Sequence, residues 1–591
     1  MKELDYPFDA SYLMQKKRSL KRRLLEKEGL IPKKIAVMSG STVGEVKHIL
    51  ELFLLHYGIK PEFYEGEYAL FYENLVFDDG SLAAFQPDII YIHTSNKNIK
   101  NYPSQTDSEA LCAEKLEAEF AKFETVWKAA LGFGCPVIQN NFELPPYRLL
   151  GNRDAWDIHG RVNFINQLNM RTAAFASANE NFYINDLAYL AACHGLDNWF
   201  DEAGWYLYKY ALRTEYIPYL AYSVANIVKS IFGKNKKSVI LDLDNTLWGG
   251  IIGDDGPEGI ELGLETPAGM AYSEFQSYLK ELSALGIMLN VCSKNEESNA
   301  LAGFNRADSI LKREDFICFK ANWDPKSKNI ADIAAEINIL PESFVFVDDN
   351  PAEREIVRQE LPTIEVPQVQ SPETYIKSLD RAGYFEVTAL SADDKKRNEM
   401  YKQNAERAAL QQSFGDYSSY LKSLQMVCEL GPFSFAHAER ITQLINKTNQ
   451  FNLTTRRYNA AEVESLIDND SYITLFGRLI DKFGDNGIVT AIIGHVQGDA
   501  LDIDLWIMSC RTFKRNLEHA MFDELVRLCA KRGIKTIKGH YYPTAKNLLV
   551  SDFYATIGFE KAEEKDGEKH FAFTAFDGYQ NQNSVMEIKH V

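Results

Sequence analysis

The sequence predicts a multidomain α/β protein built mainly on parallel sheets, and three observations carry this prediction. The chain has 591 residues, which at ~150 residues per domain leaves room for about four units. Short apolar segments alternate with helical patterns through the first two thirds of the chain, a rhythm typical of parallel sheets. In the last third, strands and helices mix in an order that predicts an α+β unit.

Composition excludes several classes of protein. The chain is 46% hydrophobic and 25% charged, so disorder, collagen and coiled-coil architectures are not expected. Its 83 acidic and 64 basic side chains give a net charge of −19, which argues against nucleic acid as a partner. No secretory signal or run long enough to span a membrane is visible, and eight scattered cysteines lack metal-ligand spacing. We therefore expect a cytoplasmic protein with reduced thiols and no membrane partner.

The first part of the chain predicts an extension followed by an α/β domain. Residues 1–30 form a helical extension, because leucines recur at helical spacing within its basic run, KKRSLKRRLLEK. Residues 31–233 form the domain, with strands predicted at KIAVMS, PDIIYIHT and CPVIQN and a long apolar helix that stops at Gly233.

The rest of the chain predicts two further domains. Residues 234–370 carry four short apolar runs that end in polar residues, with helical patterns between them, which predicts a second parallel sheet. Residues 371–414 include a charged helical stretch that we interpret as a connecting helix. Residues 415–591 form the α+β domain.

Polar side chains at the strand ends of the second domain predict an active site that could hold a cation. Asp242 and Asp244 follow the strand VIL, and residues two apart in an extended segment face the same way. Two carboxylates so close favour a bound cation or a shared proton. Ser293 follows the next strand, Lys326 lies in NWDPKS, and Asp348 and Asp349 follow FVFV. Sites of open α/β sheets lie at this edge.

This order of motifs resembles the haloacid dehalogenase (HAD) superfamily of phosphoryl-transfer enzymes. The resemblance implies that Asp242 is the nucleophile that forms an aspartyl-phosphate and that Asp244 is the general acid and base. It also implies that Thr246 and Ser293 hydrogen-bond the phosphoryl group and that Lys326 neutralises its charge.

The resemblance also implies a Mg²⁺ site. Its ligands would be Asp242, the main-chain carbonyl of Asp244 and Asp348, with Asp349 as a further ligand. The intervals from Asp242 to Ser293 and from Ser293 to Asp348 are largely used by one helix and one strand each, so no large lid domain fits there. Such an open site suits bulky or protein-borne substrates.

A closer resemblance is to the FkbH-like branch of this superfamily (subfamily IIIC), carried by LDLDNTLWGGIIGDDG, CSKN, NWDPKS and FVFVDDNPAERE. It implies an enzyme that removes phosphate from a phosphorylated glycerate and loads the glyceryl unit onto the thiol of an acyl carrier protein. Cys292, beside Ser293, is a candidate for an acyl thioester on the enzyme. Adjacent strand residues point to opposite faces, so Cys292 packed beneath the sheet is the alternative.

The last domain resembles the GNAT acetyltransferase fold, through DKFGDNG, LDIDLWIMS, CRTFKRNLE and DFYATIGFE. The resemblance implies that Arg511, Lys514 and Arg515 grip a phosphopantetheine arm, acyl-CoA or an acidic carrier protein, and that Tyr554 serves the leaving thiol. Lys514 and Asn516 replace the small residues of the usual pyrophosphate loop. A docking domain without acyltransferase chemistry therefore stays an alternative.

The first domain resembles the SGNH hydrolase fold. Ser41 stands where a nucleophile follows the first strand, but Gly40 replaces the usual Asp. The expected Asp-x-x-His pair is missing, because His159 follows Asp157 by two positions only. We predict a recognition or structural domain without hydrolysis, in which Ser41 is a helix cap or a ligand contact.

Three functions stay open. The first is a Mg²⁺-dependent phosphatase and glyceryl transferase that works with an acyl carrier protein. The second is a phosphatase for a phosphorylated small molecule, coupled to an N- or O-acyltransferase. The third is a scaffold without catalysis, which the intact set of Asp242, Asp244, Ser293, Lys326 and Asp348 disfavours.

Overall fold

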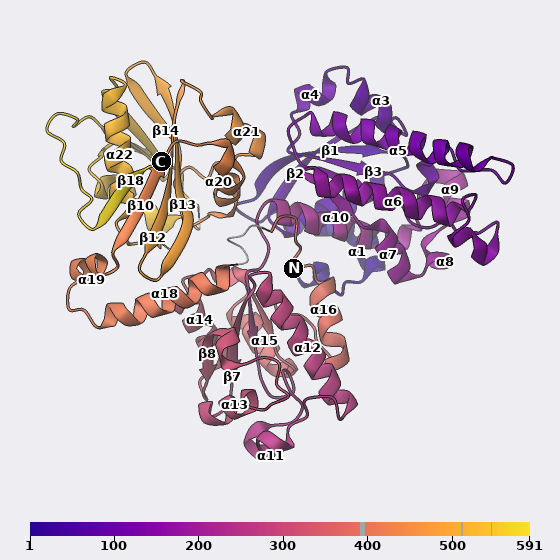
Figure 1. Ribbon diagram of the computed structural model, residues 1–591, viewed down its shortest axis with the longest axis horizontal. Coiled ribbons are helices and arrows are strands. Elements are labelled where there is room, and N and C mark those ends of the chain that lie inside the picture. The colour runs from indigo at the N-terminus through magenta and orange to yellow at the C-terminus, as the bar shows by residue number, and fades with distance from the viewer. Residues whose placement is uncertain (391–395, 510–511, 545) are drawn as a thin grey trace. The chain divides into compact units, whose positions relative to one another are not determined.

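The chain divides into two compact units, Met1–Ile231 and Phe232–Val591. The computed structural model describes residues 1–390, 396–509, 512–544 and 546–591 (Figure 1). It contains three sheets, two of them parallel and one mixed. The predicted multidomain α/β fold class is therefore confirmed. None of the described helices combines the length and the apolar character needed to cross a membrane.

The first unit is built on a parallel sheet of five strands in the order β2-β1-β3-β4-β5. Strands β3 and β4 are fully buried, as expected for a sheet covered on both faces. The strands are β1 (Ile31–Ser39), β2 (Ile59–Glu65), β3 (Ile89–His93), β4 (Val137–Asn140) and β5 (Phe182–Asn185).

Helices connect these strands and cover the sheet (Figure 1). The predicted N-terminal helix begins after Asp9, whose carboxylate accepts a hydrogen bond from Tyr12 N at 3.0 Å, and its Leu13, Leu20 and Leu24 are buried. The helices are α1 (Ala10–Leu25), α2 (Gly44–His56), α3 (Phe71–Val76), α4 (Ser81–Phe85), α5 (Glu109–Leu131), α6 (Arg161–Ala178), α7 (Leu187–His194), α8 (Leu196–Trp199), α9 (Glu202–Tyr208) and α10 (Ile217–Ile231).

The second unit begins with a parallel sheet of four strands in the order β8-β7-β6-β9. The strands are β6 (Ser238–Leu241), β7 (Met288–Ser293), β8 (Phe316–Ala321) and β9 (Phe344–Val347). The helices are α11 (Ile252–Gly259), α12 (Pro267–Ala284), α13 (Glu297–Phe304), α14 (Lys326–Glu336), α15 (Pro351–Glu360) and α16 (Tyr375–Arg381). Because β6 and β9 are neighbours, the segments that follow them meet at one edge of the sheet.

The predicted connecting stretch, 371–414, holds more than one helix. Besides α16 it contains α18 (Arg397–Gln412), while residues 391–395 lie outside the described part of the chain. Arg407 on α18 is buried and pairs with both oxygens of Asp481, at 2.7 and 2.8 Å. This buried ion pair fixes the end of α18 to the last sheet.

The last sheet is mixed, in the order β16-β17-β15-β14-β13-β12-β10-β18, with the short strand β11 paired to β14. Its strands are β10 (Met426–Gly431), β11 (Phe451–Asn452), β12 (Tyr472–Asp481), β13 (Gly484–Gln497), β14 (Ala500–Met508), β15 (Thr536–Tyr541), β16 (Glu560–Lys565), β17 (Glu568–Phe573) and β18 (Met586–His590). The helices are α19 (Tyr417–Ser423), α20 (Phe435–Lys447), α21 (Ala460–Ser465), α22 (Leu517–Lys531) and α23 (Phe553–Thr556).

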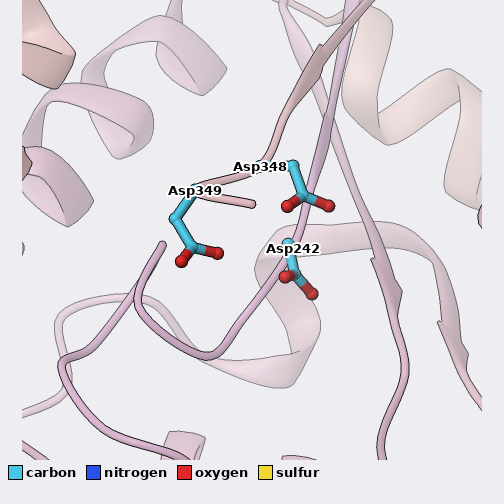
Figure 2. A group of neighbouring side chains, drawn as sticks. All are labelled: Asp242, Asp348 and Asp349. Carbon is cyan, nitrogen blue, oxygen red and sulfur yellow. The ribbon is translucent and has the colours of Figure 1, made fainter. Parts of the chain in front are cut away.

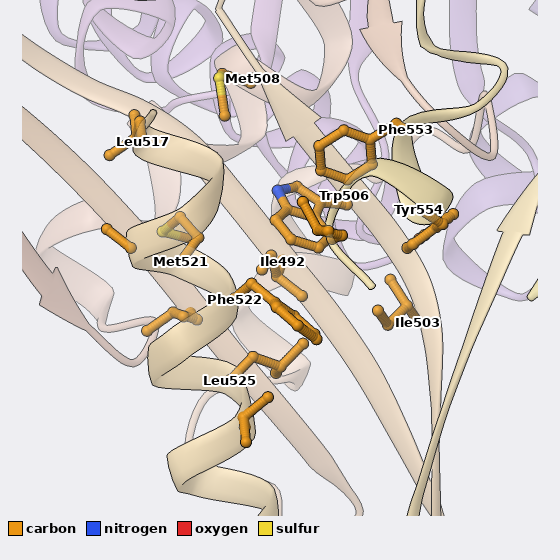
Figure 3. Packing of buried hydrophobic residues seen from close by; sticks show 14 of the residues in the cluster. Ile492, Ile503, Trp506, Met508, Leu517, Met521, Phe522, Leu525, Phe553 and Tyr554 are labelled. Carbon is orange, nitrogen blue, oxygen red and sulfur yellow. The ribbon is translucent and has the colours of Figure 1, made fainter. Parts of the chain in front are cut away.

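Apolar cores lie on both faces of this sheet. On one face, α22 packs Met521, Phe522 and Leu525 toward Ile492 and Trp506 of the strands (Figure 3). The other core joins α20 and α21 to β12, β13 and β14. Burial of large apolar side chains on both faces supplies the main driving force for folding of this part.

Candidate active site

The candidate active site lies where β6 and β9 end. Asp242 directly follows β6, and its backbone N–H donates to Val347 O at 3.0 Å, so the two strand ends are held together. Oxygens of Asp242, Asp348 and Asp349 all lie within 4.8 Å of one another, and the three side chains converge in Figure 2. The structure therefore brings together three of the predicted metal ligands.

The carboxyls of Asp348 and Asp349 have raised pKa values in this cluster. Burial, followed by the charge of Asp242, raises the pKa of the Asp348 carboxyl above its ordinary range, and the same two causes raise the pKa of Asp349. Both effects disfavour several ionised carboxylates in one small space. A divalent cation removes this penalty, and carboxylate oxygens are the ligands that Mg²⁺ prefers. The donor set therefore fits Mg²⁺.

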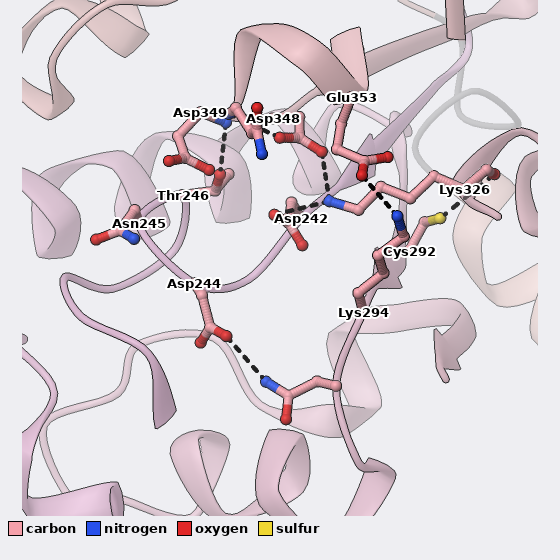
Figure 4. A network of polar contacts seen from close by, with 12 residues as sticks. Asp242, Asp244, Asn245, Thr246, Cys292, Lys294, Lys326, Asp348, Asp349 and Glu353 are labelled. Atoms are coloured by element: carbon pink, nitrogen blue, oxygen red, sulfur yellow. Dashed lines mark hydrogen bonds and ion pairs between the residues drawn. The ribbon is translucent and has the colours of Figure 1, made fainter. Parts of the chain in front are cut away.

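Lys326 supplies a positive charge from within the protein. Its Nζ lies 2.9 Å from Asp242 Oδ2 and 2.5 Å from Asp348 Oδ2, and its side chain is almost fully buried (Figure 4). Burial alone lowers the pKa of this ammonium, but the two carboxylates outweigh burial and raise the pKa above its ordinary value. Lys326 therefore stays charged and sits where it can also contact a phosphoryl group bound at Asp242.

Two hydroxyl residues predicted to bind the phosphoryl group lie at the same sheet edge. Thr246 is buried, and its Oγ1 accepts a hydrogen bond from Asp349 N at 3.2 Å. Ser293 is the last residue of β7 and is also buried. Through this hydrogen bond, Thr246 connects the turn after Asp242 to the loop that carries Asp348 and Asp349.

Asp244 points away from the carboxylate cluster. Its Oδ1 accepts hydrogen bonds from Trp248 Nε1 at 2.9 Å and Ile252 N at 3.1 Å, and its Oδ2 accepts one from Asn295 Nδ2 at 3.1 Å. Burial raises the pKa of Asp244, a direction that suits a general acid. The carboxylate of Asp244 does not belong to the cluster of Asp242, Asp348 and Asp349. The role as a metal ligand that is implied for its main-chain carbonyl stays a prediction.

The residues that hold Asp244 and the Asp348–Asp349 turn were not predicted from the sequence. Trp248 and Asn295 orient the predicted acid, and Arg354 Nη1 donates to the carbonyl oxygens of Asp348 and Asp349 at 2.6 and 2.7 Å. Asn295 follows a strand that ends in Ser293, so its place after a strand end was a usable signal. Trp248 and Arg354 had no such signal in the sequence, because their contacts with Asp244 and with the Asp348–Asp349 carbonyls depend on the shape of the turns between them.

Cys292 lies beneath the site, not in it. Its side chain belongs to the buried core of this sheet, and its Sγ lies 3.7 Å from Lys326 O. Burial raises the pKa of the thiol to about 12, even though Lys326 acts in the opposite direction. A thiolate is therefore disfavoured at neutral pH. The acyl-thioester role of Cys292 stays a prediction that this geometry does not favour.

The basic residues predicted to bind a carrier in the last domain have different surroundings. Arg511 lies outside the described residues. Lys514 is exposed, whereas Arg515 is buried and lies 3.2 Å from Asp481 and 2.8 Å from Asn404. Arg515 therefore serves the internal ion pair that also includes Arg407.

Tyr554, predicted to serve a leaving thiol, is also internal. It is buried beside Trp506 and Phe553 (Figure 3), and burial raises the pKa of its hydroxyl. A Cβ at Gly539 would lie 2.6 Å from its ring, so glycine there lets the ring pack against β15. The predicted role of Tyr554 would require this packing to open.

In the first unit, Ser41 is buried just beyond the end of β1, and its Oγ has no hydrogen-bond partner among the described residues. His159 is engaged locally, with Nδ1 at 2.8 Å from Asp157 and Nε2 at 2.9 Å from Asp107 O. Neither ring nitrogen is left to act on Ser41. The absence of hydrolysis in this domain stays a prediction.

The sheet and the acid cluster define the second parallel domain as HAD-like, as predicted. Comparison with known proteins agrees. Residues 47–229 match the family model described as FkbH, N-terminal domain. The chain is 28% identical to the N-terminal part of the protein BF1531 from Bacteroides fragilis, whose structure contains a phosphatase domain complexed with Mg; the match covers 63% of this chain and 99% of that one, with a TM-score of 0.59.

Other matches concern about a quarter of the chain. They include the ribosomal-protein-S18-alanine N-acetyltransferase from Escherichia coli (15% identity, covering 24% of this chain and 90% of that one) and the PaiA N-acetyltransferase from Thermoplasma acidophilum in complex with coenzyme A (14%, 25% and 98%). Both have a TM-score of 0.20, which is too low to carry an argument. The comparison with curated proteins finds no match.

Proposed function

We propose that this chain is a Mg²⁺-dependent phosphatase that uses Asp242 as its nucleophile. The observation that carries the proposal is the convergence of Asp242, Asp348 and Asp349 around one point beside the buried ammonium of Lys326. The Mg-bound phosphatase domain in the similar protein from Bacteroides fragilis supports it.

The residues divide the work as follows. Asp242 Oδ attacks phosphorus, and the phosphate–oxygen bond to the leaving group breaks as an aspartyl-phosphate forms. Lys326 balances the charge of the transferred group from within hydrogen-bond distance of the nucleophile. Asp244 protonates the leaving oxygen and then deprotonates the water that releases phosphate. Asp242, Asp348 and Asp349 would hold Mg²⁺, and the bound ion would supply further positive charge to the phosphoryl oxygens.

The finer proposal is that a phosphorylated glycerate-like donor gives its acyl unit to the thiol of an acyl carrier protein. The sulfur bonds to the carboxyl carbon as the bond from that carbon to the phosphate-bearing oxygen breaks, and phosphate leaves. Between Asp242 and Ser293, a fully described stretch, the chain holds α11, α12 and the sheet strand β7, so the site has no domain-sized lid. Trp323, 68% exposed, lies in the loop before Lys326 and donates to Glu296 at 2.8 Å. An open edge with an exposed aromatic side chain suits a substrate borne by a protein.

A phosphatase for a small molecule is the second candidate. The observation that favours it is the burial of the residues that were predicted to handle the acyl group, Cys292, Arg515 and Tyr554. In this case the products are free phosphate and a free alcohol, and no carrier is acylated.

One experiment separates these candidates. The chain is incubated with Mg²⁺, a phosphorylated glycerate and a panel of carrier proteins that bear phosphopantetheine, and both free phosphate and carrier mass are measured. A glyceryl mass gain supports the finer proposal, whereas phosphate without the gain supports the second candidate. No phosphate release from any phosphorylated donor tested would leave only a scaffold.

The nucleophile is tested with a matched pair of variants. Asp242→Asn should lower phosphate release by about three orders of magnitude or more, because the attacking oxygen is lost. Asp254→Asn changes an exposed carboxylate on α11 and should leave the rate within about twofold of the starting protein. Equal rates for both variants would rule out Asp242 as the nucleophile.

A further inference from the structure

A second group of polar side chains lies in the last domain, where β14 and β15 part. These parallel strands pair only between Ala500–Asp502 and Thr536–Lys538. Further along, the edge of β14 that faces away from β13 pairs with β11 instead, through Phe451 and Asn452. The strand pair therefore opens just past Asp502.

Asp502 begins a chain of hydrogen bonds across three strands. Its Oδ1 lies 2.8 Å from His540 Nε2, and His540 Nδ1 lies 2.7 Å from His570 Nδ1. His540 and His570 are direct partners in the β15–β17 register, and their rings meet edge to face with centroids 5.0 Å apart. The side chains of Asp502 and His540 are 29% and 18% exposed, so the chain of contacts is open to solvent on one side.

The donors and acceptors of Asp502, His540 and His570 restrict which ring nitrogens carry protons. Asp502, when ionised, only accepts, so His540 carries its proton on Nε2. If His540 is neutral, its Nδ1 is a bare acceptor, and the contact of 2.7 Å then requires His570 to carry its proton on Nδ1. The Nε2 of His570 is then unprotonated and can act as a base.

We propose that Asp502, His540 and His570 form a proton relay, with His570 as the general base for an alcohol or amine substrate. As the substrate O–H or N–H bond breaks, its proton bonds to His570 Nε2. The Nδ1 proton of His570 moves to His540 Nδ1. The positive charge comes to rest on His540, beside the carboxylate of Asp502. Asp502 and His540 act as positioning residues.

The surroundings support transfer in this direction. Electrostatic interactions reach Asp502 from His540, Lys538 and Arg456, and its hydrogen bond to His540 is the main cause that lowers its pKa, so Asp502 stays ionised. Asp504, two residues after Asp502 on β14, has its own partners. The hydroxyl of Tyr458 donates to Asp504 Oδ2 at 2.5 Å, and Arg456 forms an ion pair with the same carboxylate. Asp504 is therefore already satisfied and does not compete for the relay proton.

Two nearby groups stand outside the relay. The ring of Tyr554 packs on the face of β15 to which a Cβ at Gly539 would point, opposite the side chain of His540, and its hydroxyl interacts with the backbone of His540. Burial raises the pKa of this hydroxyl, so Tyr554 keeps its proton and takes no part in the relay. Glu568, on the same hairpin as His570, is exposed and interacts with Tyr542. The relay also uses none of the residues of the phosphoryl site, and it stands or falls independently of the proposed phosphatase activity.

The first test reads the protons directly, by nitrogen NMR of the full chain labelled only at histidine. At a pH where both rings are neutral, we expect His570 to be protonated on Nδ1 and bare on Nε2. Asp502→Ala should shift the signals of His570, which Asp502 does not touch, because His540 loses the acceptor that sets its tautomer. Asp502→Asn is a second variant in case the alanine variant does not fold, and its expected shift is in the same direction.

His437→Gln is the matched control, because His437 lies on α20 in the same domain and contacts Ser434 and Phe476 instead of the relay. It should leave the His570 signals in place. A proton on His570 Nε2 in the starting protein, or unchanged His570 signals in both Asp502 variants, would overturn the proposal. So would a tightly held zinc ion whose removal shifts both rings.

The second test measures base catalysis with p-nitrophenyl acetate as the probe. Water is the proton donor here: its oxygen bonds to the acetyl carbon, nitrophenolate leaves, and the water proton passes to His570 Nε2. We expect His570→Gln to lower this hydrolysis by about tenfold or more, with no effect in His437→Gln. Phosphate release should persist in His570→Gln. Equal hydrolysis of the probe by the two variants would contradict a basic His570.

Discussion

At the scale of the residue, Glu143 shows how burial alone sets chemistry in the first unit. It is fully buried after β4; its Oε2 accepts from Asn96 N at 3.3 Å, and its Oε1 has no partner among the described residues. Burial raises the pKa of its carboxyl from 4.5 to about 7. Glu143 is thus held near the point where it changes charge under ordinary conditions.

This pKa predicts a dependence of stability on pH. A carboxyl whose pKa is raised in the folded state binds its proton more tightly there, so its folding penalty is absent below pH 4.5 and grows as pH rises to about 7. Glu143→Gln removes the penalty and should stabilise the first unit by about 1–3 kcal/mol at pH 8 but little at pH 5. Hydrogen exchange of peptides from β3 and β4 measures the difference.

His93 also makes the stability of the first unit depend on pH. It is buried on β3, and burial lowers its pKa to about 4, so its own contribution to stability is lost as pH falls from 6.5 through 4. Comparing Glu143→Gln with the starting protein at each pH removes this shared effect. A constant difference between pH 5 and 8 would show that Glu143 is ionised throughout.

At the scale of the element, helix α13 supports the predicted acid from behind. A Cβ at Gly303 would lie 2.8 Å from the ring of Trp248 and 3.0 Å from Ile252. Trp248 Nε1 and Ile252 N are two of the donors that hold Asp244. Glycine at this position therefore lets α13 approach the turn that carries Asp244, and the packing of one helix controls the orientation of the carboxyl that is predicted to be the acid.

Gly303→Ala should consequently lower turnover of the phosphatase by about 10- to 100-fold, because the displaced Trp248 misplaces Asp244. Mg²⁺ affinity should be unchanged, since Trp248 and Ile252 contact none of the grouped carboxylates. Steady-state kinetics and calorimetric Mg²⁺ titration measure the two effects. Gly253→Ala is the matched control, because a Cβ there meets nothing within 4 Å. Equal turnover in both variants would contradict the role of α13.

At the scale of the whole molecule, the division into Met1–Ile231 and Phe232–Val591 predicts that the activities are separable. The complete acid cluster, Lys326 and the His540 relay belong to the second unit. Residues 232–591 expressed alone should keep Mg²⁺-dependent phosphate release within about threefold of the full chain, and residues 1–231 should unfold cooperatively by themselves. Loss of release by the larger fragment would show that the site needs the first unit.

The phosphoryl site could be predicted to a large extent because its residues follow strand ends. Parallel strands end at one edge of a sheet, so Asp242, Ser293 and Asp348 had to meet there once the strands were recognised. The direction of Asp244 could not be predicted in this way. It depends on Trp248 and Asn295, which reach the carboxylate across a turn and from another strand end.

The last domain could be predicted less well. Arg515 is one of a basic series in the sequence, but its partner Asp481 lies on another strand, so nothing local shows that it is buried. The His540–His570 contact depends on the β15–β17 register and was not predicted. Pairing register is set by long-range packing, which a local pattern does not contain.

The sequence by itself determined the parallel α/β class, the order of the strands along the chain and the acids that meet at their ends, because these follow from hydrophobic periodicity and from the geometry of parallel sheets. Only the tertiary structure decided which side chains are usable. It buried Cys292, Tyr554 and Arg515, turned Asp244 toward Trp248 and Asn295, and joined Asp502 to His570 through His540. Burial and hydrogen bonding between distant segments set the charge and the direction of each group, and both depend on the completed fold.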